Sequence, residues 1–217
     1  NFNFINGDVR DKKLLQKQLN RADVIIPLAA IVGFPLCKKK PTEATEVNYE
    51  INKWIADNKS KDQMVIYPCT NSGYGTTSGQ LHCTEESPLN PITHYGKTKV
   101  WAETAFREKE NHITFRLATV FGPSPRMRKD LLVNDFVWRA KKEKLIVLFQ
   151  EHFMRNYIHI HDVCEAFKFV INNWDECKNE TYNVGNDAIN MNKLQLAEKI
   201  NQYVPMEIIR AQYTEDP

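Results

Sequence analysis

The chain has 217 residues, 42% of them hydrophobic, and its mean hydropathy is −0.52. A chain of this length and composition can bury a sizeable core, which excludes a disordered protein. Lys and Arg number 29 against 27 Asp and Glu, and the longest like-charged cluster is the short lysine run at residues 38–40. We therefore expect neither a nucleic acid nor a membrane surface as a partner.

The length of the apolar stretches and the spacing of the cysteines indicate the compartment in which the protein works. The longest apolar stretches, such as residues 24–32, are far shorter than the about 20 residues of a membrane span, and no charged-then-apolar leader opens the chain. Five cysteines are scattered without CxxC spacing, at Cys37, Cys69, Cys83, Cys164 and Cys177. This pattern favours reduced thiols in a cytoplasmic protein over a disulfide framework or a zinc site, and we expect no metal centre.

The first part of the chain alternates strand-length apolar runs with helical patterns. Asp11 is a candidate helix N-cap, and the predicted strand at 23–28 is continuously apolar after Asp23, as expected for a strand covered on both faces. In chain order we expect a strand at 2–6, a helix from 11, a strand at 23–28, a helix at 42–58, a strand at 64–69, a loop at 70–91, a helix at 94–111 and a strand at 113–118. This order predicts an α/β fold with a doubly wound parallel sheet.

The regular alternation loosens after Pro123. There we expect a helix near 130–142, strands at 145–149 and 156–160, a helix opened by Asp162, a strand at 181–184 and a helix from Asn192. A mixed segment of this kind is typical of a smaller lobe. We therefore divide the chain into residues 1–123, which hold most of the sheet, and residues 124–217, mainly a second lobe with some segments returning to the sheet.

Tyr95 and Lys99 are the first candidates for chemistry, because they stand four apart at the start of a predicted helix and so share one of its faces. A neighbouring ammonium stabilises phenolate, and a phenolate can take the proton of an alcohol whose carbon loses a hydride. Thr70 ends a predicted parallel strand, where ligands bind in open α/β sheets. Its hydroxyl is suited to hydrogen-bond the reacting oxygen.

Five segments follow one another in the order of one enzyme family. They are YPCTNSGYG at 67–75, ESPLNPITHYGKTKVWAE at 86–103, RLATVFGPS at 116–124, RNYIHIHDV at 155–163 and TYNVGN at 181–186. Across essentially the whole chain, the sequence resembles extended short-chain dehydrogenases that act on nucleotide-sugars, such as 4-epimerases and 4,6-dehydratases. The resemblance implies a Rossmann-like domain in 1–123 that binds NAD, with NADP not excluded. It also implies a substrate-binding lobe in 124–217 for a nucleotide-diphosphate sugar.

The resemblance implies a role for each matching position. Catalysis is implied for Thr70, Tyr95 and Lys99, with Lys99 also holding the nicotinamide ribose. Cofactor contacts are implied for Asp8, Val9, Leu28, Ala29, Ala30, Asn48, Tyr95, Lys99 and Ala118. Substrate contacts are implied for Asn71, Thr119, Asn134 and Arg155, whose guanidinium suits a diphosphate.

The sequence departs from the family pattern at both ends. The glycine-rich G-x-x-G-x-x-G turn, whose amides meet the pyrophosphate in this family, is not present. The chain opens on what resembles the third strand of the family's sheet and stops before its last helices. We therefore expect the sequence to be part of a longer protein.

The residues after Thr70 bear on the type of reaction. In the family's 4,6-dehydratases the equivalent Thr is followed by Asp-Glu, which exchange protons as water is lost, whereas here Asn71 and Ser72 follow. An amide and an unassisted hydroxyl exchange protons poorly near neutral pH, so dehydration is disfavoured. Oxidation at C4 by a 4-dehydrogenase or 4-epimerase is favoured, with a 4,6-dehydratase or a 4-reductase as the alternative. A non-catalytic dinucleotide-binding module is the opposing class.

Two further features concern the pathway and assembly. The segment LAAIVGFPLCKK at 28–39 resembles bacterial GDP-heptose 4-dehydrogenases and epimerases of surface-polysaccharide pathways. The helices at 42–58 and 94–111 carry more apolar residues than one core-facing stripe requires, Trp101 and Ala105 among them. In the resembled family these helices meet their copies across a two-fold axis, which implies a homodimer.

Overall fold

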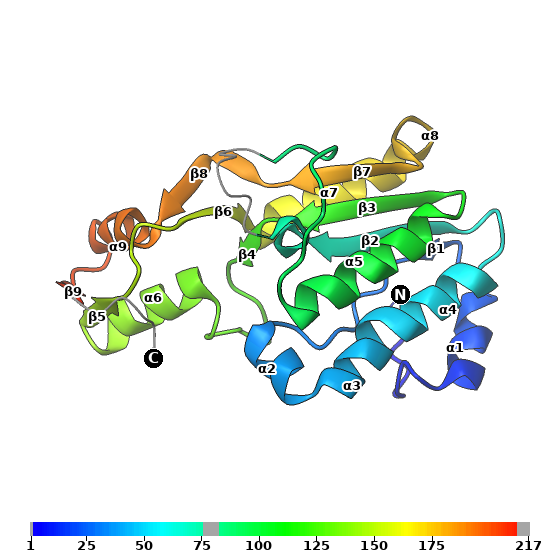
Figure 1. The fold of residues 1–217 in the computed structure, drawn as a ribbon, viewed down its shortest axis with the longest axis horizontal. Coiled ribbons are helices and arrows are strands. Elements are labelled where there is room, and N and C mark those ends of the chain that lie inside the picture. Colours follow the sequence, from blue (N-terminus) through cyan, green and yellow to red (C-terminus); the bar gives the residue numbers. More distant parts are fainter. Residues whose placement is uncertain (1, 76–82, 212–217) are drawn as a thin grey trace. The chain divides into compact units, whose positions relative to one another are not determined.

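The computed structural model describes residues 2–75 and 83–211 (Figure 1). The chain divides into two compact units, one made of Asn1–Leu117 with Phe169–Asn183 and the other of Ala118–Lys168 with Val184–Pro217. Every helix in the described ranges is too short or too polar to cross a membrane.

The first unit is built on a four-stranded sheet with the strand order β1-β2-β3-β7. Its strands are β1 (Val24–Ile25), β2 (Met64–Thr70), β3 (His112–Leu117) and β7 (Glu180–Val184). Strand β2 runs parallel to both β1 and β3, and the register with β3 extends from Val65 opposite His112 to Thr70 opposite Leu117. The helices are α1 (Lys12–Leu19), α2 (Phe34–Lys39), α3 (Pro41–Thr45), α4 (Ile51–Asn58), α5 (His94–Arg107) and α8 (Trp174–Cys177).

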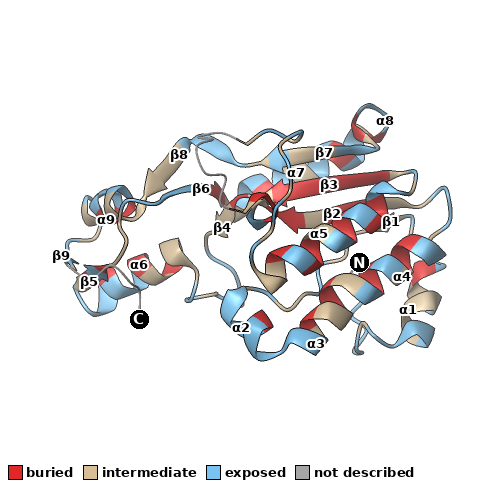
Figure 2. Ribbon diagram, viewed as in Figure 1, coloured by how far each residue is buried: buried red, intermediate tan, exposed pale blue. Residues whose placement is uncertain are grey.

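The core of this unit lies on one face of β2. Alternate residues Val65, Tyr67 and Cys69 point to the same face, where Ala102 and Phe106 of α5 pack against them together with side chains from α1 and α4. Strand β3 is buried along almost its whole length (Figure 2). Continuous burial is typical of parallel strands covered on both faces, so the apolar runs of β2 and β3 identify them as central strands.

A π-helical turn over Glu46–Glu50 joins α3 to α4. The side-chain amide of the buried Asn52 donates to two main-chain carbonyls of this turn, those of Val47 at 3.2 Å and Asn48 at 3.1 Å. The turn is therefore stabilised by a buried side chain one turn further along.

The second unit contains two small sheets. Strand β6 (Met154–His159) pairs parallel with β4 (Thr119–Phe121) and antiparallel with β8 (Asn186–Asn192), while β5 (Leu145–Leu148) pairs parallel with β9 (Glu207–Arg210). Helices α6 (Leu132–Lys142) and α9 (Lys193–Asn201) cover a core that includes Phe136, Leu148 and Leu196. Asn192 and Gln195 form a reciprocal capping box at the start of α9.

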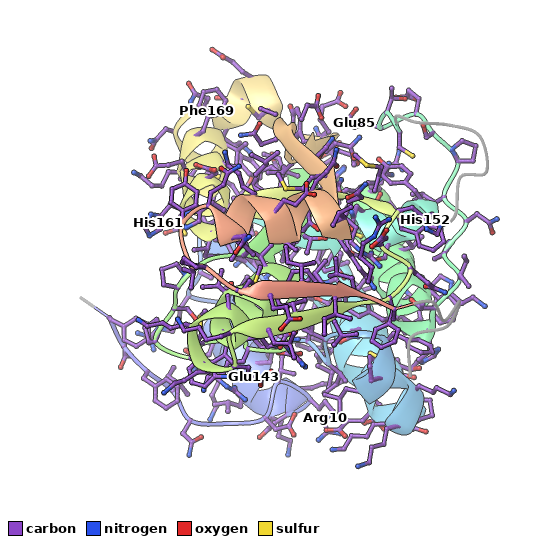
Figure 3. All side chains as sticks on the ribbon, turned by 90° about the vertical axis from the view of Figure 1, so that its left-hand side faces the viewer. Arg10, Glu85, Glu143, His152, His161 and Phe169 are labelled. Carbon is purple, nitrogen blue, oxygen red and sulfur yellow. The ribbon has the colours of Figure 1, made fainter. Side chains whose placement is uncertain are left out.

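Helix α7 (Ile160–Asn172) begins in the second unit and ends in the first. Phe169 on this helix is 61% exposed, and its ring points away from the helix axis (Figure 3). The helix begins at Ile160, two residues before the start expected at Asp162.

Several expected elements differ from the structure. Residues 2–6 form no strand, because no neighbouring strand in the described ranges pairs with them, and a strand needs a partner for its hydrogen bonds. The strand expected at 23–28 is reduced to Val24–Ile25. The helix expected at 42–58 is divided into α3, the π-helical turn and α4, with Pro41 as the first residue of α3. Strands β8 and β9 and the short helices α2 and α8 were not expected.

Candidate functional site

Thr70 is the last residue of β2, and its side chain shapes the chain that follows. Its hydroxyl oxygen accepts a hydrogen bond from the Ser72 amide at 3.2 Å and caps a short 3₁₀ turn over Asn71–Tyr74. The hydroxyl also donates to the Asn71 side-chain oxygen at 3.5 Å. Thr70 is thus fixed at the carboxyl end of a central parallel strand, where open α/β sheets bind ligands.

Tyr95 and Lys99 occupy the first turns of α5, which is capped by Thr93 through a 3.0 Å bond to the Gly96 amide. The turn after Thr70 packs on the same part of the helix. A Cβ placed on Gly96 would lie 3.1 Å from the Ser72 carbonyl oxygen, a tighter contact than most side chains make, so the two backbones approach closely here. The structure therefore brings the turn bearing Asn71 against the start of the helix bearing Tyr95.

Lys99 is almost completely buried, with only 4% of its surface exposed. Its ammonium lies 4.2 Å from the centroid of the Tyr67 ring. Burial lowers the pKa of Lys99 to about 8, against the opposing influence of Cys69 and Glu103. A buried ammonium on the face that carries Tyr95 can stabilise the phenolate form of that tyrosine.

Asn48, a predicted cofactor contact, is fully buried and binds the chain that follows β1. Its side-chain oxygen accepts from the Ile31 amide at 2.8 Å, and its side-chain nitrogen donates to the Ile31 carbonyl at 2.9 Å. The same nitrogen lies 3.3 Å from the Thr98 hydroxyl of α5. Asn48 therefore ties the segment after β1 to the helix that carries Tyr95 and Lys99.

The predicted cofactor segment directly precedes Ile31. Leu28 and Ala29 are exposed and Ala30 is half-buried. A partly exposed segment that follows a parallel strand, with the small residues Ala29 and Ala30, can lie against a dinucleotide, so these residues fit such a group.

Asp8 and Val9, the predicted adenine contacts, lie just before α1. The Asp8 carboxylate makes a 2.7 Å ion pair with Arg10, and Arg10 also pairs with Glu46 at 2.7 Å. The Arg10 side chain lowers the pKa of Asp8 to about 2. Asp8 is therefore ionised and already bound to Arg10, so an adenine that contacts the Asp8 carboxylate has to share its oxygens with Arg10.

The remaining predicted residues belong to the second unit. Ala118 is buried, and its amide donates to the Val184 carbonyl at 2.9 Å. Thr119 is half-buried and opens β4, where it lies opposite Tyr157. Arg155 is exposed on β6, opposite Met191.

Asn134 has a structural role in the second unit. Its side-chain oxygen accepts from the Gly122 amide at 3.2 Å, and its side-chain nitrogen donates to the Arg128 carbonyl at 3.0 Å. It therefore closes the loop over residues 122–128. Its predicted contact with a nucleotide remains a prediction.

A buried polar network was not expected from the sequence. Arg116 of β3 forms an ion pair with Glu103 of α5 and donates to the Tyr74 hydroxyl at 2.9 Å and to the Glu85 carbonyl at 2.9 Å. The Tyr74 hydroxyl donates in turn to the Asn183 side chain at 2.6 Å. Glu85 lies in the chain between the turn and α5 (Figure 3). An arginine inside the apolar run of β3 was the signal for such a network, because a buried cation needs a partner.

A parallel sheet that binds ligands at its carboxyl edge, with a Tyr-x-x-x-Lys pair on the helix after a central strand, is the arrangement that the resemblance to dinucleotide-dependent α/β enzymes implies. The model of the NAD dependent epimerase/dehydratase family matches residues 1–185. The chain belongs to this family, which confirms the resemblance to extended short-chain dehydrogenases and identifies an NAD-dependent enzyme.

Similar proteins of known name agree with this assignment. The chain is 28% identical to the low-salt glycan biosynthesis protein Agl12 of Haloferax volcanii, over 100% of this chain and 70% of that protein. It is 23% identical to a UDP-glucose 4-epimerase of Lactobacillus helveticus, over 91% of this chain and 68% of that protein.

Solved structures confirm the Rossmann-like fold class. The structure of a UDP-glucuronic acid 4-epimerase from Bacillus cereus matches with a TM-score of 0.84 at 22% identity, over 97% of this chain and 68% of that one. A dTDP-glucose 4,6-dehydratase from Bacillus anthracis matches with a TM-score of 0.80 at 20% identity, over 98% of this chain and 69% of that one. Because epimerases and a dehydratase match alike, the likeness shows the fold and does not select the reaction.

Proposed function

We propose that the protein oxidises the C4 carbinol of a nucleotide-activated sugar, as a 4-epimerase or 4-dehydrogenase that serves glycan or surface-polysaccharide synthesis. The observation that carries this proposal is the buried Lys99 ammonium near the start of α5, on the helix face of Tyr95, with the turn that follows Thr70 packed against Gly96 of the same helix. The similar proteins, a glycan biosynthesis protein and UDP-sugar 4-epimerases, support the choice of substrate class.

In this proposal three side chains act on the sugar hydroxyl. Tyr95 as phenolate accepts the hydroxyl proton, and Lys99 keeps its ammonium charge near the phenolate oxygen. The Thr70 hydroxyl, already held by its bond with the Ser72 amide, hydrogen-bonds the reacting oxygen. Bound NAD supplies the hydride acceptor.

The cofactor is assigned to the residues at the carboxyl ends of the parallel strands. The exposed segment Leu28–Ala30 lies against the dinucleotide, and Asn48 keeps that segment in place through Ile31. Asp8 and Val9 lie near the adenine, Lys99 holds the nicotinamide ribose, and Ala118 approaches the nicotinamide.

The substrate is assigned partly to the second unit. The exposed Arg155 guanidinium binds the diphosphate, because its planar fork matches phosphate oxygens. Asn71 and Thr119 contact the sugar, and Asn134 lies near the nucleotide.

The proposal favours simple oxidation over dehydration. Asn71 and Ser72 follow Thr70 in the turn. The Asn71 amide and the Ser72 hydroxyl exchange protons poorly near neutral pH, so together they cannot supply the acid and the base. An enzyme that removes water from the sugar needs such a pair. We therefore expect no 4-keto-6-deoxy product.

We also propose a homodimer through the helical face formed by residues 42–58 and α5. Trp101 is 43% exposed there, and its ring lies 5.5 Å from that of Tyr49 and 6.4 Å from that of His94. An exposed aromatic cluster on a helix face is suited to an isologous contact.

The test is turnover by the full-length enzyme loaded with NAD. UDP-, GDP-, dTDP- and CDP-sugars are offered in turn, reduced cofactor is followed by absorbance, and products are identified by NMR and mass spectrometry. Inversion or oxidation at C4 supports the proposal. A 4-keto-6-deoxy product, or no turnover of any nucleotide-sugar, contradicts it.

A further inference from the structure

Tyr67 contacts Lys99 in two ways. It is completely buried in β2, and the face of its ring lies 4.2 Å from the Lys99 ammonium. Its hydroxyl also donates a hydrogen bond of 3.4 Å to the Lys99 main-chain carbonyl. One side chain of the strand therefore touches both the charge and the backbone of the lysine.

Apart from Tyr67, the described groups that favour the charged form of Lys99 are Cys69 and Glu103. Tyr67 and Cys69 face it from β2, and Tyr95 and Glu103 share its helix. Glu103 is engaged by Arg116 of β3 in a buried ion pair. Among the residues that the structure describes, no carboxylate lies within ion-pair distance of the Lys99 ammonium, although burial penalises its charge.

Besides the coulombic influence of Cys69 and Glu103, the aromatic face of Tyr67 contacts the ammonium directly. A ring attracts a cation through the negative potential of its π face, and the attraction is strongest where water is excluded. Burial raises the pKa of Tyr67 well above its usual range, so its hydroxyl stays protonated and does not compete with Tyr95 as a base.

We propose that Tyr67 is a positioning residue, whose buried ring face holds the Lys99 ammonium charged and in place on the helix that carries Tyr95. The role in catalysis rests on the function proposed above, because it acts through Lys99. The contact between ring and ammonium itself does not depend on the identity of the substrate.

Three variants separate the ring face from its other contributions. Tyr67→Phe keeps the face and removes the hydroxyl. Tyr67→Leu removes the face. Phe106→Leu is the matched control, because the Phe106 ring packs 5.1 Å from that of Tyr67 in the same core and has no ammonium over it in the described contacts.

The decisive measurement is the titration of Lys99 itself. Protein labelled with ¹³C-lysine is titrated by NMR, and the Lys99 signal is assigned as the one lost in Lys99→Arg. Tyr67→Leu should lower the Lys99 pKa by about one unit relative to the parent protein. Tyr67→Phe and Phe106→Leu should leave it within a few tenths of a unit.

The outcomes are distinct. A Lys99 pKa that is unchanged or raised in Tyr67→Leu overturns the proposal, as does an equal fall in Phe106→Leu. If Tyr67→Leu does not fold by circular dichroism, Tyr67→Met replaces it, because methionine fills more of the space without a π face.

The pH profile of kcat/KM tests the link to catalysis. If Lys99 loses charge in Tyr67→Leu, the phenolate form of Tyr95 is stabilised less, so the acid limb of the profile should move to higher pH. The limb should stay in place in Phe106→Leu. An unmoved limb in Tyr67→Leu overturns the positioning role. If the parent enzyme turns over no nucleotide-sugar, the function proposed above fails, while the Lys99 titration still decides whether Tyr67 holds the ammonium.

Discussion

Glu103 and Arg116 form a buried ion pair in which Oε1 of Glu103 lies 2.6 Å from Nη2 of Arg116, with both side chains 1% exposed. The Arg116 Nε also donates to Glu103 at 3.1 Å. The pair joins α5 to β3, so the helix of Tyr95 and Lys99 is attached to the sheet by a charged contact as well as by packing.

Removing one partner of this pair should be costly. Arg116→Met leaves the Glu103 carboxylate buried without its cation, and we expect the free energy of unfolding to fall by about 3–5 kcal/mol. Urea denaturation measures the change. The double variant Glu103→Leu/Arg116→Met removes both charges and should recover much of the loss; a double variant no more stable than Arg116→Met would contradict this account.

Replacing Lys99 should stabilise the fold in a pH-dependent way. The pKa of Lys99 is lowered to about 8 in the folded state from 10.5, so between these values the unfolded chain binds more protons and stability rises with pH. Below about pH 8 the burial penalty is present in full. Lys99→Met should therefore be more stable than the parent by about 3 kcal/mol at pH 7, from the size of the shift.

That advantage should shrink as the pH rises from 8 towards 10.5, because the parent's lysine becomes neutral in both states. Thermal unfolding of the two proteins across this range measures the difference in their stability. The titration of Cys69 and Tyr67 largely cancels in that difference, because both proteins contain these residues. A constant difference from pH 7 to pH 10.5 would show that Lys99 is not desolvated.

Tyr95→Phe removes the proposed base and keeps the ring. We expect turnover of the nucleotide-sugar to fall by about 10²-fold or more, with NAD binding retained. Steady-state kinetics and a cofactor titration give the two values. Near-normal turnover would show that Tyr95 is not the base of the proposed reaction.

Arg155→Ala should weaken substrate binding selectively. Loss of a charge-assisted hydrogen bond to a diphosphate costs about 1.5–3 kcal/mol, so KM should rise about 10- to 100-fold while NAD affinity stays constant. The matched control is Arg210→Ala, on an exposed arginine that pairs with Glu151. If NAD affinity falls instead of substrate affinity, Arg155 binds the cofactor.

Trp101→Glu should dissociate the proposed dimer, because it places a charge in the aromatic cluster with Tyr49 and His94. Analytical ultracentrifugation of the full-length protein at micromolar concentration measures the effect. A monomeric parent protein would refute the homodimer. A dimer that persists in Trp101→Glu would show that the interface lies on another surface.

The sequence was sufficient for the parts of the fold that depend on local patterns. Strand β2 and helix α5 follow from a continuous apolar run and a helical period, which place Thr70 and Tyr95 at the two predicted positions. Asp11 and Asn192 cap α1 and α9 because their side chains accept from nearby amides.

Contacts distant in the sequence could not be predicted in this way. Arg116 and Glu103 lie on different elements, and only the packing of α5 on the sheet brings them together. The ring of Tyr67 looked like an ordinary core residue of a strand, because nothing in its spacing indicates that a lysine from the next helix lies over it. Strand β8 is mostly polar, and β9 is only 4 residues long, so neither shows a recognisable strand pattern.

The π-helical turn over Glu46–Glu50 limits how this segment can tolerate insertions and deletions. A π turn already holds one residue more than an α turn, so deleting one residue here could close the segment to a continuous α-helix with α3 and α4 still in register. A further inserted residue would instead rotate α4 by about 100° relative to α3. Ile51 and Ile55 would then leave the core, and Asn52 would no longer reach the carbonyls of Val47 and Asn48. The length of this turn therefore has an upper limit, set by the core beneath it and by the asparagine beyond it.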